Sequence, residues 1–166
     1  MTAKLVLAGA VAAVLAGAAA LWLAPRGEAP ASARSAAQLE IAPLTIETAQ
    51  GKREFRVELA RTAAEQSRGL MHRRRMERDA GMLFVHRSPE VALMWMKNTY
   101  IPLDMLFIGA DGRIARIAER TVPESEATIS SGVPVIAVLE LNGGTASRLG
   151  IAVGDRVRTR ALPTGR

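Results

Sequence analysis

The feature that most constrains this chain is the length of its apolar segments, each of which is about as long as one β-strand. Glycine, proline, aspartate and polar residues separate these segments, which favours tight turns between short strands. The pattern predicts a mainly β fold, that is, a β-rich α+β domain whose antiparallel sheet curls into a barrel or a sandwich. The segments lie at residues 44–49, 53–60, 81–85, 91–97, 101–109, 113–122 and 133–142, and a last short strand follows the turn at 154–155.

Only two short helices are expected. Thr62 is followed three residues later by Glu65, which is the spacing of a capping box at a helix N-terminus. Gly69 suits the C-terminal end of this first helix. Thr145 is expected to cap a second helix of a single turn.

Turn residues also predict which strands pair. The sequence QGK at 50–52 indicates a hairpin between the first two strands, and Asp111-Gly112 indicates another between 101–109 and 113–122. We further expect a hairpin between 91–97 and 102–108. In that register Lys97 and Asp104 would be diagonal neighbours on one face of the sheet.

The N-terminal segment has the layout of an export signal. Lys4 precedes an uncharged run over 5–23, so residues 1–23 are expected to be a signal peptide or an N-terminal membrane anchor. Residues 24–37 are rich in proline, alanine and serine, as expected of a flexible linker, and 38–162 then form a single domain. The expected location is periplasmic or extracellular, with 5–23 as an alternative anchor to the inner membrane.

Composition limits the classes of function. The chain has no cysteine, which excludes thiol catalysis and cysteine metal ligands. The net charge is +6, and the densest basic stretch runs from Arg68 to Arg78. We interpret that stretch as a solvated turn. Nucleic acid is a poor partner for an exported protein, contact with the membrane is expected only through the N-terminal segment, and attraction to anionic envelope components stays open.

A polar cluster inside apolar sequence is the main candidate site. Trp95, Lys97, Asn98 and Asp104 lie within or between two apolar segments. One interpretation is a shallow pocket for a small anion, a sugar acid or a peptide carboxylate. The other interpretation, slightly favoured, is a structural Lys97–Asp104 ion pair beside a loop that Asn98 fixes.

Glu140, inside the apolar sequence VLELN, is a second acidic candidate. It is expected to face a pocket or to pair with an arginine such as Arg68, although an outward-facing strand position is equally consistent with the sequence. The ligand-binding candidates are therefore Trp95, Lys97, Asn98, Asp104, Glu140 and Arg68.

Catalytic and metal motifs are missing. The sequences HExxH, G-x-S-x-G and Ser-x-x-Lys do not occur, so no catalytic residue is assigned and an enzyme is not the preferred class. An acid pair drawn from Asp104, Glu140 and Asp155 would be the basis of an alternative hydrolase-type function. Six of the seven methionines lie between Met71 and Met105, a pattern that could suit Cu(I), but core packing explains it better, so no metal or cofactor is expected.

Several short motifs carry a family resemblance. They are RGLM at 68–71, GMLF at 81–84, WMKNT at 95–99, PLDMLFI at 102–108, VLELNGG at 138–144 and GD at 154–155. Over residues 53–158 the chain resembles the family called domain of unknown function 192. The resemblance implies an exported, β-rich, single-domain protein, and it implies no activity. The expected function is therefore a small binding or envelope-associated module with a polar site near WMKNT, whose ligand is an unknown small molecule or envelope component.

Overall fold

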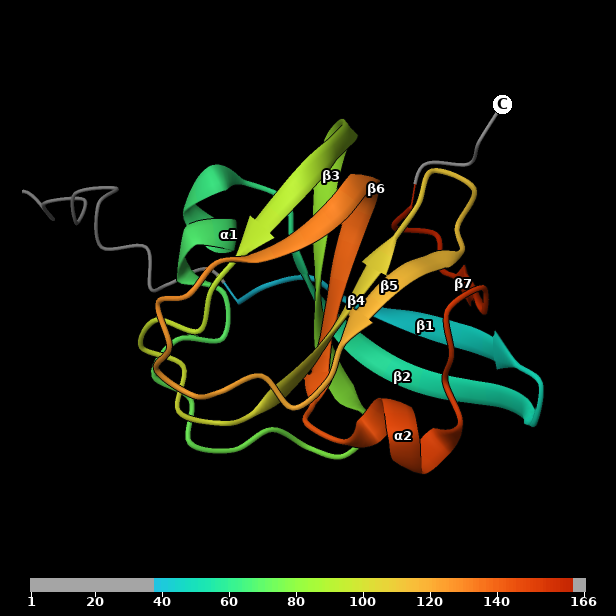
Figure 1. Cartoon of the computed structure of the whole chain (residues 1–166), viewed down its shortest axis with the longest axis horizontal. Coiled ribbons are helices and arrows are strands. Elements are labelled where there is room, and N and C mark those ends of the chain that lie inside the picture. Colours follow the sequence, from blue (N-terminus) through green and yellow to red (C-terminus); the bar gives the residue numbers. More distant parts are fainter. Residues whose placement is uncertain (1–37, 163–166) are drawn as a thin grey trace, which may run out of the picture. The chain divides into compact units, whose positions relative to one another are not determined.

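The computed structural model describes residues 38–162, which contain seven strands and two short helices (Figure 1). The expected signal segment and linker, residues 1–37, lie outside the described residues. The mainly β fold is confirmed. In chain order the elements are β1 (Ile41–Thr48), β2 (Gly51–Ala60), α1 (Ala63–Arg68), β3 (Ala80–Met94), β4 (Leu103–Ile108), β5 (Ile114–Ala118), β6 (Ile129–Asn142), α2 (Thr145–Leu149) and β7 (Arg156–Arg158).

All seven strands belong to one sheet, in the order β5-β4-β6-β3-β2-β1-β7. The sheet is mixed: its pairs are mainly antiparallel, as expected, and one pair is parallel. The exception is the pair β2 and β3, which run parallel, with Val57 opposite Gly81. Parallel neighbours need a crossover connection, and the segment that contains α1 supplies it.

The sheet curls into a half-barrel, as Figure 1 shows. Its two outer strands approach each other at one end, where Arg113 forms an isolated antiparallel bridge with Arg156. The N–H of Val157 donates to the carbonyl of Gly112 (2.8 Å), and the N–H of Ile114 donates to the carbonyl of Asp155 (2.9 Å). These contacts protect part of both sheet edges from solvent and from other strands.

Two groups of buried side chains pack on opposite faces of the central strands. On β6, Leu139 and Leu141 pack with residues such as Leu44 and Ile136 in the larger cluster. Val138 points the other way, into a cluster that includes Met96 and Met105. This alternation follows from the two-residue period of a strand, and it decides which face Glu140 occupies.

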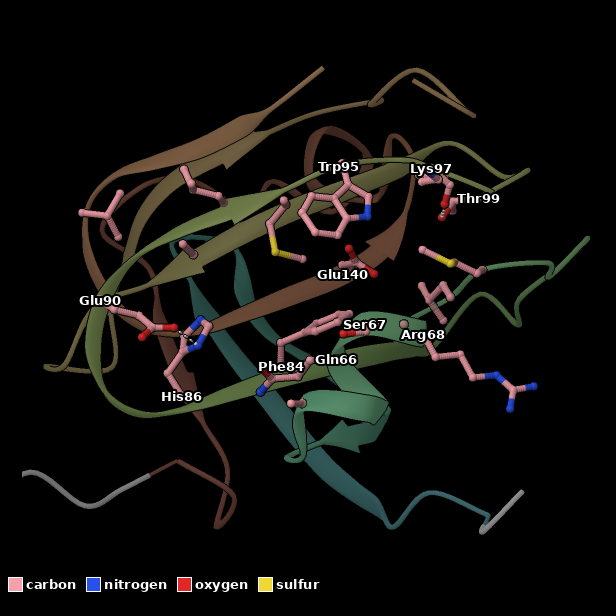
Figure 2. Close-up of a pocket in the computed structure, with 18 residues that line it drawn as sticks. Gln66, Ser67, Arg68, Phe84, His86, Glu90, Trp95, Lys97, Thr99 and Glu140 are labelled. Atoms are coloured by element: carbon pink, nitrogen blue, oxygen red, sulfur yellow. Dashed lines mark hydrogen bonds and ion pairs between the residues drawn. The ribbon is translucent and has the colours of Figure 1, made fainter. Parts of the chain in front are cut away.

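Strand β3 joins two segments that we expected to be separate, 81–85 and 91–97. Its pairing with β6 is irregular: Val85 faces Ala137, whereas Glu90 faces Val135. The four residues 86–89 of β3 therefore lie opposite the single residue Ile136 of β6, and such an insertion bends a strand. Figures 1 and 2 show the second half of β3 turning back over the first half.

Two of the three expected hairpins are confirmed. Strand β1 pairs with β2 around a turn at Thr48–Gly51, and β4 pairs with β5 around the turn that contains Asp111-Gly112. The expected hairpin between 91–97 and 102–108 is wrong, because β4 pairs with β5 and β6 and does not pair with β3. The residues 95–102 between β3 and β4 form an irregular connection instead of a tight turn.

The helix caps follow the sequence at α1 and depart from it at α2. Thr62 and Glu65 form the predicted capping box, and Gly69 ends α1. Thr145 is the first residue of α2 and not its cap; Gly144, with φ of 83°, occupies the cap position without a side-chain bond. Within the described residues, no helix has the length and apolar character needed to cross a membrane.

Candidate functional site

A pocket of about 480 Å³ lies in the bend of β3 (Figure 2). Four parts of the chain line it: α1 with the residues that follow it, both halves of β3, the connection after β3, and Glu140 of β6. The walls are largely apolar, with Leu70, Met71, Phe84, Ala92, Leu93, Met94 and Trp95 among them. A volume of this size accommodates a small organic molecule.

Glu140 supplies a buried carboxyl group to the pocket. Strand alternation turns its side chain away from Leu139 and Leu141, and its cross-strand neighbours are Met82 on β3 and Met105 on β4. The residue is only 4% exposed, and no hydrogen bond or ion pair engages its side chain within the described residues. Its carboxyl oxygens are not fully enclosed by protein atoms, in contrast to His86 Nε2, so they face the open pocket. Figure 2 shows the carboxyl among the lining side chains and, in that view, between the rings of Trp95 and Phe84.

Burial raises the pKa of the Glu140 carboxyl from 4.5 to about 8. The cause is desolvation, because an ionised carboxylate is costly in surroundings that provide neither a cation nor hydrogen-bond donors. At neutral pH the group is therefore mostly protonated, and it loses its proton more readily when a ligand supplies positive charge.

His86 and Glu90, at the bend of β3, form a polar pair in the pocket wall. The ring Nδ1 of His86 lies 2.9 Å from a carboxylate oxygen of Glu90. The other ring nitrogen, Nε2, is buried and has no partner among the described residues. His86 and Glu90 both line the pocket, but Nε2 itself is enclosed by protein atoms and is not open to the cavity.

Cationic side chains stand at the margin of the pocket. Lys97 is about half exposed, and its Nζ lies 3.4 Å from a carboxylate oxygen of Glu126. The Arg68 side chain is exposed, and Figure 2 shows it directed away from the other lining residues. Of the alternatives for Glu140, the ion pair with Arg68 does not form, and the pocket-facing position is the one observed.

The basic stretch around Arg68–Arg78 is mostly exposed, as expected of a solvated turn. Arg73 departs from that pattern, because its guanidinium binds both carboxylate oxygens of Glu58 at 2.5 and 2.6 Å. These hydrogen bonds raise the pKa of Arg73 above its ordinary value. Arg73 therefore ties the connection after α1 to β2.

The expected Lys97–Asp104 ion pair is wrong. Asp104 is fully buried, and its carboxylate accepts hydrogen bonds from the backbone N–H groups of Arg120, Gly144 and Ala146, each at 2.8 Å. Asp104 thus holds together β4, the segment after β5 and the start of α2. Asp104 does not line the pocket. The ion pair is absent because β4 pairs with β6, whereas Lys97 lies in the connection after β3 and outside the sheet.

Asn98, a ligand-binding candidate, does not line the pocket, and it has the structural role of the alternative interpretation at a different place in the fold. Its φ is 54°, in the left-handed region that asparagine tolerates better than most residues. Its carbonyl accepts a bond from the N–H of His72 (2.8 Å), while the Thr99 carbonyl accepts one from Glu124 (3.0 Å). The WMKNT motif is therefore a turn that joins two neighbouring loops, and Trp95, Lys97 and Thr99 project from it into the pocket wall.

Of the remaining acidic and methionine candidates, most have structural roles, but Met94 lines the pocket. Asp155 accepts a bond from the N–H of Ala152 (2.8 Å) and does not line the pocket, so Asp104, Glu140 and Asp155 do not form an acid pair. Met96 and Met105 are fully buried, as expected of core residues, whereas Met94 is partly buried and lines the pocket. Over residues 38–162 no three His, Asp or Glu side chains gather as metal ligands would.

The pocket includes residues that sequence reasoning did not select. His86 and Glu90 lie in the sequence HRSPE, which reads as an ordinary polar connection. Gln66, Ser67 and Phe84 belong to a short helix and a strand with no unusual sequence feature. Pro89, between two apolar segments, indicates an irregular strand. Whether the side chains of the two halves of β3 meet in one pocket depends on how far the strand bends, which the sequence does not specify.

The curled sheet and the pocket define a small β-rich domain with one buried carboxyl group in an apolar cavity. The chain belongs to the family described as an uncharacterized ACR, the domain of unknown function 192, whose sequence profile matches residues 45–159. The family resemblance seen in the sequence motifs is thus confirmed.

Two solved structures are similar over most of this domain. One is a crystal structure of a protein from Sinorhizobium meliloti 1021, described as a "putative transcription regulator"; it is 46% identical, with a TM-score of 0.75, covering 77% of this chain and 100% of the other. The other is a protein of unknown function from Novosphingobium aromaticivorans DSM 12444, also 46% identical, with a TM-score of 0.72, covering 74% of this chain and 88% of the other. No curated protein matches the chain.

Proposed function

We propose that this domain binds a small, largely apolar molecule in the pocket at the bend of β3, with the Glu140 carboxyl as its polar anchor. The observation that carries this proposal is the burial of Glu140 without a partner among the described residues, at the wall of a cavity of about 480 Å³. A buried polar group that the protein leaves unsatisfied costs free energy of folding. A ligand that satisfies the group would recover that cost on binding.

The composition of the walls supports a ligand with a substantial apolar part. Aromatic, aliphatic and methionine side chains make up half of the lining residues, and polar groups are placed among them. This combination is usual for small-molecule sites, in which apolar contact gives affinity and the polar groups give orientation. The half-exposed Trp95 and the exposed Leu93 and Val91 gain burial when the pocket is filled.

A binding module fits the site better than the hydrolase-type alternative. Two of the three carboxylates considered for an acid pair hold backbone N–H groups, and only Glu140 reaches the pocket. Glu90 also lines the pocket, but it is engaged with His86. We therefore propose retention of a ligand and not its hydrolysis.

The test is a thermal-shift screen of the full chain against sugars, amino acids, amines, carboxylic acids, nucleotides and metal salts. Ala63 and Ala64 are adjacent exposed residues of α1, and only Ala63 lines the pocket. Ala63→Trp should obstruct the cavity, whereas Ala64→Trp adds the same ring to the same helix outside it. We expect at least one compound to raise the Tm of the wild type and of Ala64→Trp, but not of Ala63→Trp. A screen without any compound that discriminates the two variants would overturn the proposal.

We also propose that the domain works outside the cytoplasm, on the strength of Lys4 and the uncharged run over 5–23. Residues 1–37 fused to a reporter that is active only after export should give activity, and the same fusion without 1–23 should not. Equal reporter activity with and without 1–23 would contradict this location.

A further inference from the structure

We propose that the ligand of this pocket carries an ammonium group on an apolar body, and that the Glu140 carboxylate binds the ammonium. This inference rests on the proposed binding function and adds the chemical class of the ligand. It is carried by the missing countercharge of Glu140, by the aromatic rings that line the same cavity and by the apolar side chains of its walls.

The charged and titratable groups around Glu140 leave it without a cation. Its neighbours across the sheet, Met82 and Met105, are uncharged. The other ionisable groups that line the pocket are Arg68 on α1, His86 and Glu90 on β3, and Lys97 in the connection after β3.

None of these four groups compensates Glu140. Lys97 pairs with Glu126, and His86 pairs with Glu90. Arg68 is exposed and extends away from the other lining side chains. A ligand must therefore bring the positive charge if the carboxylate is to be stabilised.

The two aromatic rings that line the same pocket as Glu140 also favour a cation. In the view of Figure 2 the carboxyl lies between the indole of Trp95 and the ring of Phe84. The face of an aromatic ring carries partial negative charge and attracts an ammonium group, most strongly where water is excluded. A carboxylate combined with two aromatic rings suits an ammonium group better than a hydroxyl, and it disfavours an anion.

The proton balance of the binding step sets its pH dependence. Glu140 is mostly protonated at neutral pH, because burial raises its pKa to about 8. Binding an ammonium group in an ion pair requires the ionised carboxylate, so one proton passes from Glu140 to the solvent for each ligand bound. Affinity should then rise with pH until Glu140 is ionised in the free protein, and should level off above that point.

Three probes with one apolar body separate the head groups: phenylpropylammonium, phenylpropanol and phenylpropanoate. The ammonium keeps its charge between about pH 6 and pH 9, since alkylamines titrate near the lysine value. We expect calorimetric titration of the full chain to show the tightest binding for phenylpropylammonium. Its affinity should rise by about tenfold per pH unit between about pH 6 and pH 7, and change little above about pH 8.

Two variants identify the groups responsible. Glu140→Gln keeps the size of the side chain and cannot ionise, so it should abolish the rise with pH and the proton release. Trp95→Ala removes a half-exposed ring and should weaken phenylpropylammonium by about tenfold, with a smaller loss for phenylpropanol.

The outcomes separate this inference from the proposed function. If phenylpropanol or phenylpropanoate binds at least as tightly as the ammonium, and Ala63→Trp abolishes that binding, the ammonium class is wrong and the pocket is still a binding site. Ammonium affinity that stays flat or falls between about pH 6 and pH 8 would likewise overturn the inference. If none of the three probes binds, the inference is also wrong, and the compound screen decides the proposed function separately.

Discussion

At the scale of single residues, two buried carboxyl groups of this domain have opposite surroundings. Asp104 accepts three backbone N–H groups and therefore joins segments of the chain. Glu140 accepts none among the described residues and faces a cavity. The same chemical group is structural in one position and available to a ligand in the other, because only Asp104 is surrounded by donors.

Replacing Asp104 should destabilise the fold strongly. Asp104→Ala would leave three backbone N–H groups without an acceptor, two of them at the start of α2. The free energy of unfolding should fall by about 3 kcal/mol or more. Asp104→Asn should cost less, since it keeps one acceptor oxygen. Urea denaturation measures both. The control is Asp111→Ala, which removes one bond to the N–H of Arg113 in an exposed turn. A loss for Asp104→Ala no larger than that for Asp111→Ala would contradict the structural role.

The stability of the domain should depend on pH through Glu140. Its pKa is about 8 in the folded protein, compared with the ordinary value of 4.5 in the unfolded chain. Between these two pH values the carboxyl is protonated in the folded state and ionised in the unfolded state. Glu140 therefore favours folding most at low pH, and this contribution declines as pH rises from about 5 to 8, by at most about 1.4 kcal/mol per pH unit.

Glu140→Gln isolates this effect from all other titrating groups. The variant cannot ionise, so the difference in free energy of unfolding, variant minus wild type, should grow steadily in favour of the variant between about pH 5 and pH 8. Denaturant titrations at several pH values measure it. A difference that does not change with pH would mean that Glu140 is not desolvated in the folded protein.

At the scale of elements, α1 forms one wall of the pocket although it is a single short helix. Its capping box fixes its start, and Gln66 fixes it to the sheet. The side-chain amide of Gln66 donates to the carbonyls of Ala60 (3.2 Å) and Val85 (3.0 Å), which belong to two different strands. Because isolated helices of this length are unstable, these attachments hold the wall in place.

Gln66→Ala should therefore loosen α1 without unfolding the domain. We expect a loss of about 1–2 kcal/mol in the free energy of unfolding and faster hydrogen exchange of the α1 amides. Ser67→Ala is the matched control, because Ser67 is the next residue of the helix, is exposed and makes no side-chain hydrogen bond within the described residues. Equal exchange rates in the two variants would show that Gln66 does not anchor the helix.

At the scale of the whole domain, closure of the sheet depends on β7. This strand pairs with β1 and contacts the start of β5, so it covers two edges at once. Its central residue Val157 is buried in the larger core cluster, where it faces Ile46.

A charge at Val157 should separate β7 from β1 and from the start of β5. Val157→Asp would place an unpaired carboxylate in the core, with an expected cost of at least about 3 kcal/mol, and the exposed edges should promote association. Val153→Asp introduces the same charge at a residue that is 62% exposed, and should change stability by less than about 0.5 kcal/mol. Urea denaturation and size-exclusion chromatography follow the two effects. Identical behaviour of the two variants would mean that β7 is not needed for closure.

Local sequence patterns were enough to predict much of the fold. Strand-length apolar segments predicted a mainly β domain, Asp111-Gly112 predicted the β4–β5 hairpin, and the spacing of Thr62 and Glu65 predicted the start of α1. Each of these features depends on residues a few positions apart, whose backbone preferences act within the element itself. The apolar sequence around Glu140 was also enough to mark it as a candidate.

Only the tertiary structure decided the partners of the charged residues. Lys97 and Asp104 are close in sequence, but β4 pairs with β5 and β6, so Asp104 lies near Gly144 and Lys97 lies near Glu126. The pocket likewise unites His86, Glu140 and α1 through a bend in β3 and a parallel crossover. Strand order and strand bending result from packing between distant segments, which no local period encodes. The sequence by itself therefore determined the elements of this protein, and packing determined which of its carboxyl groups faces the cavity.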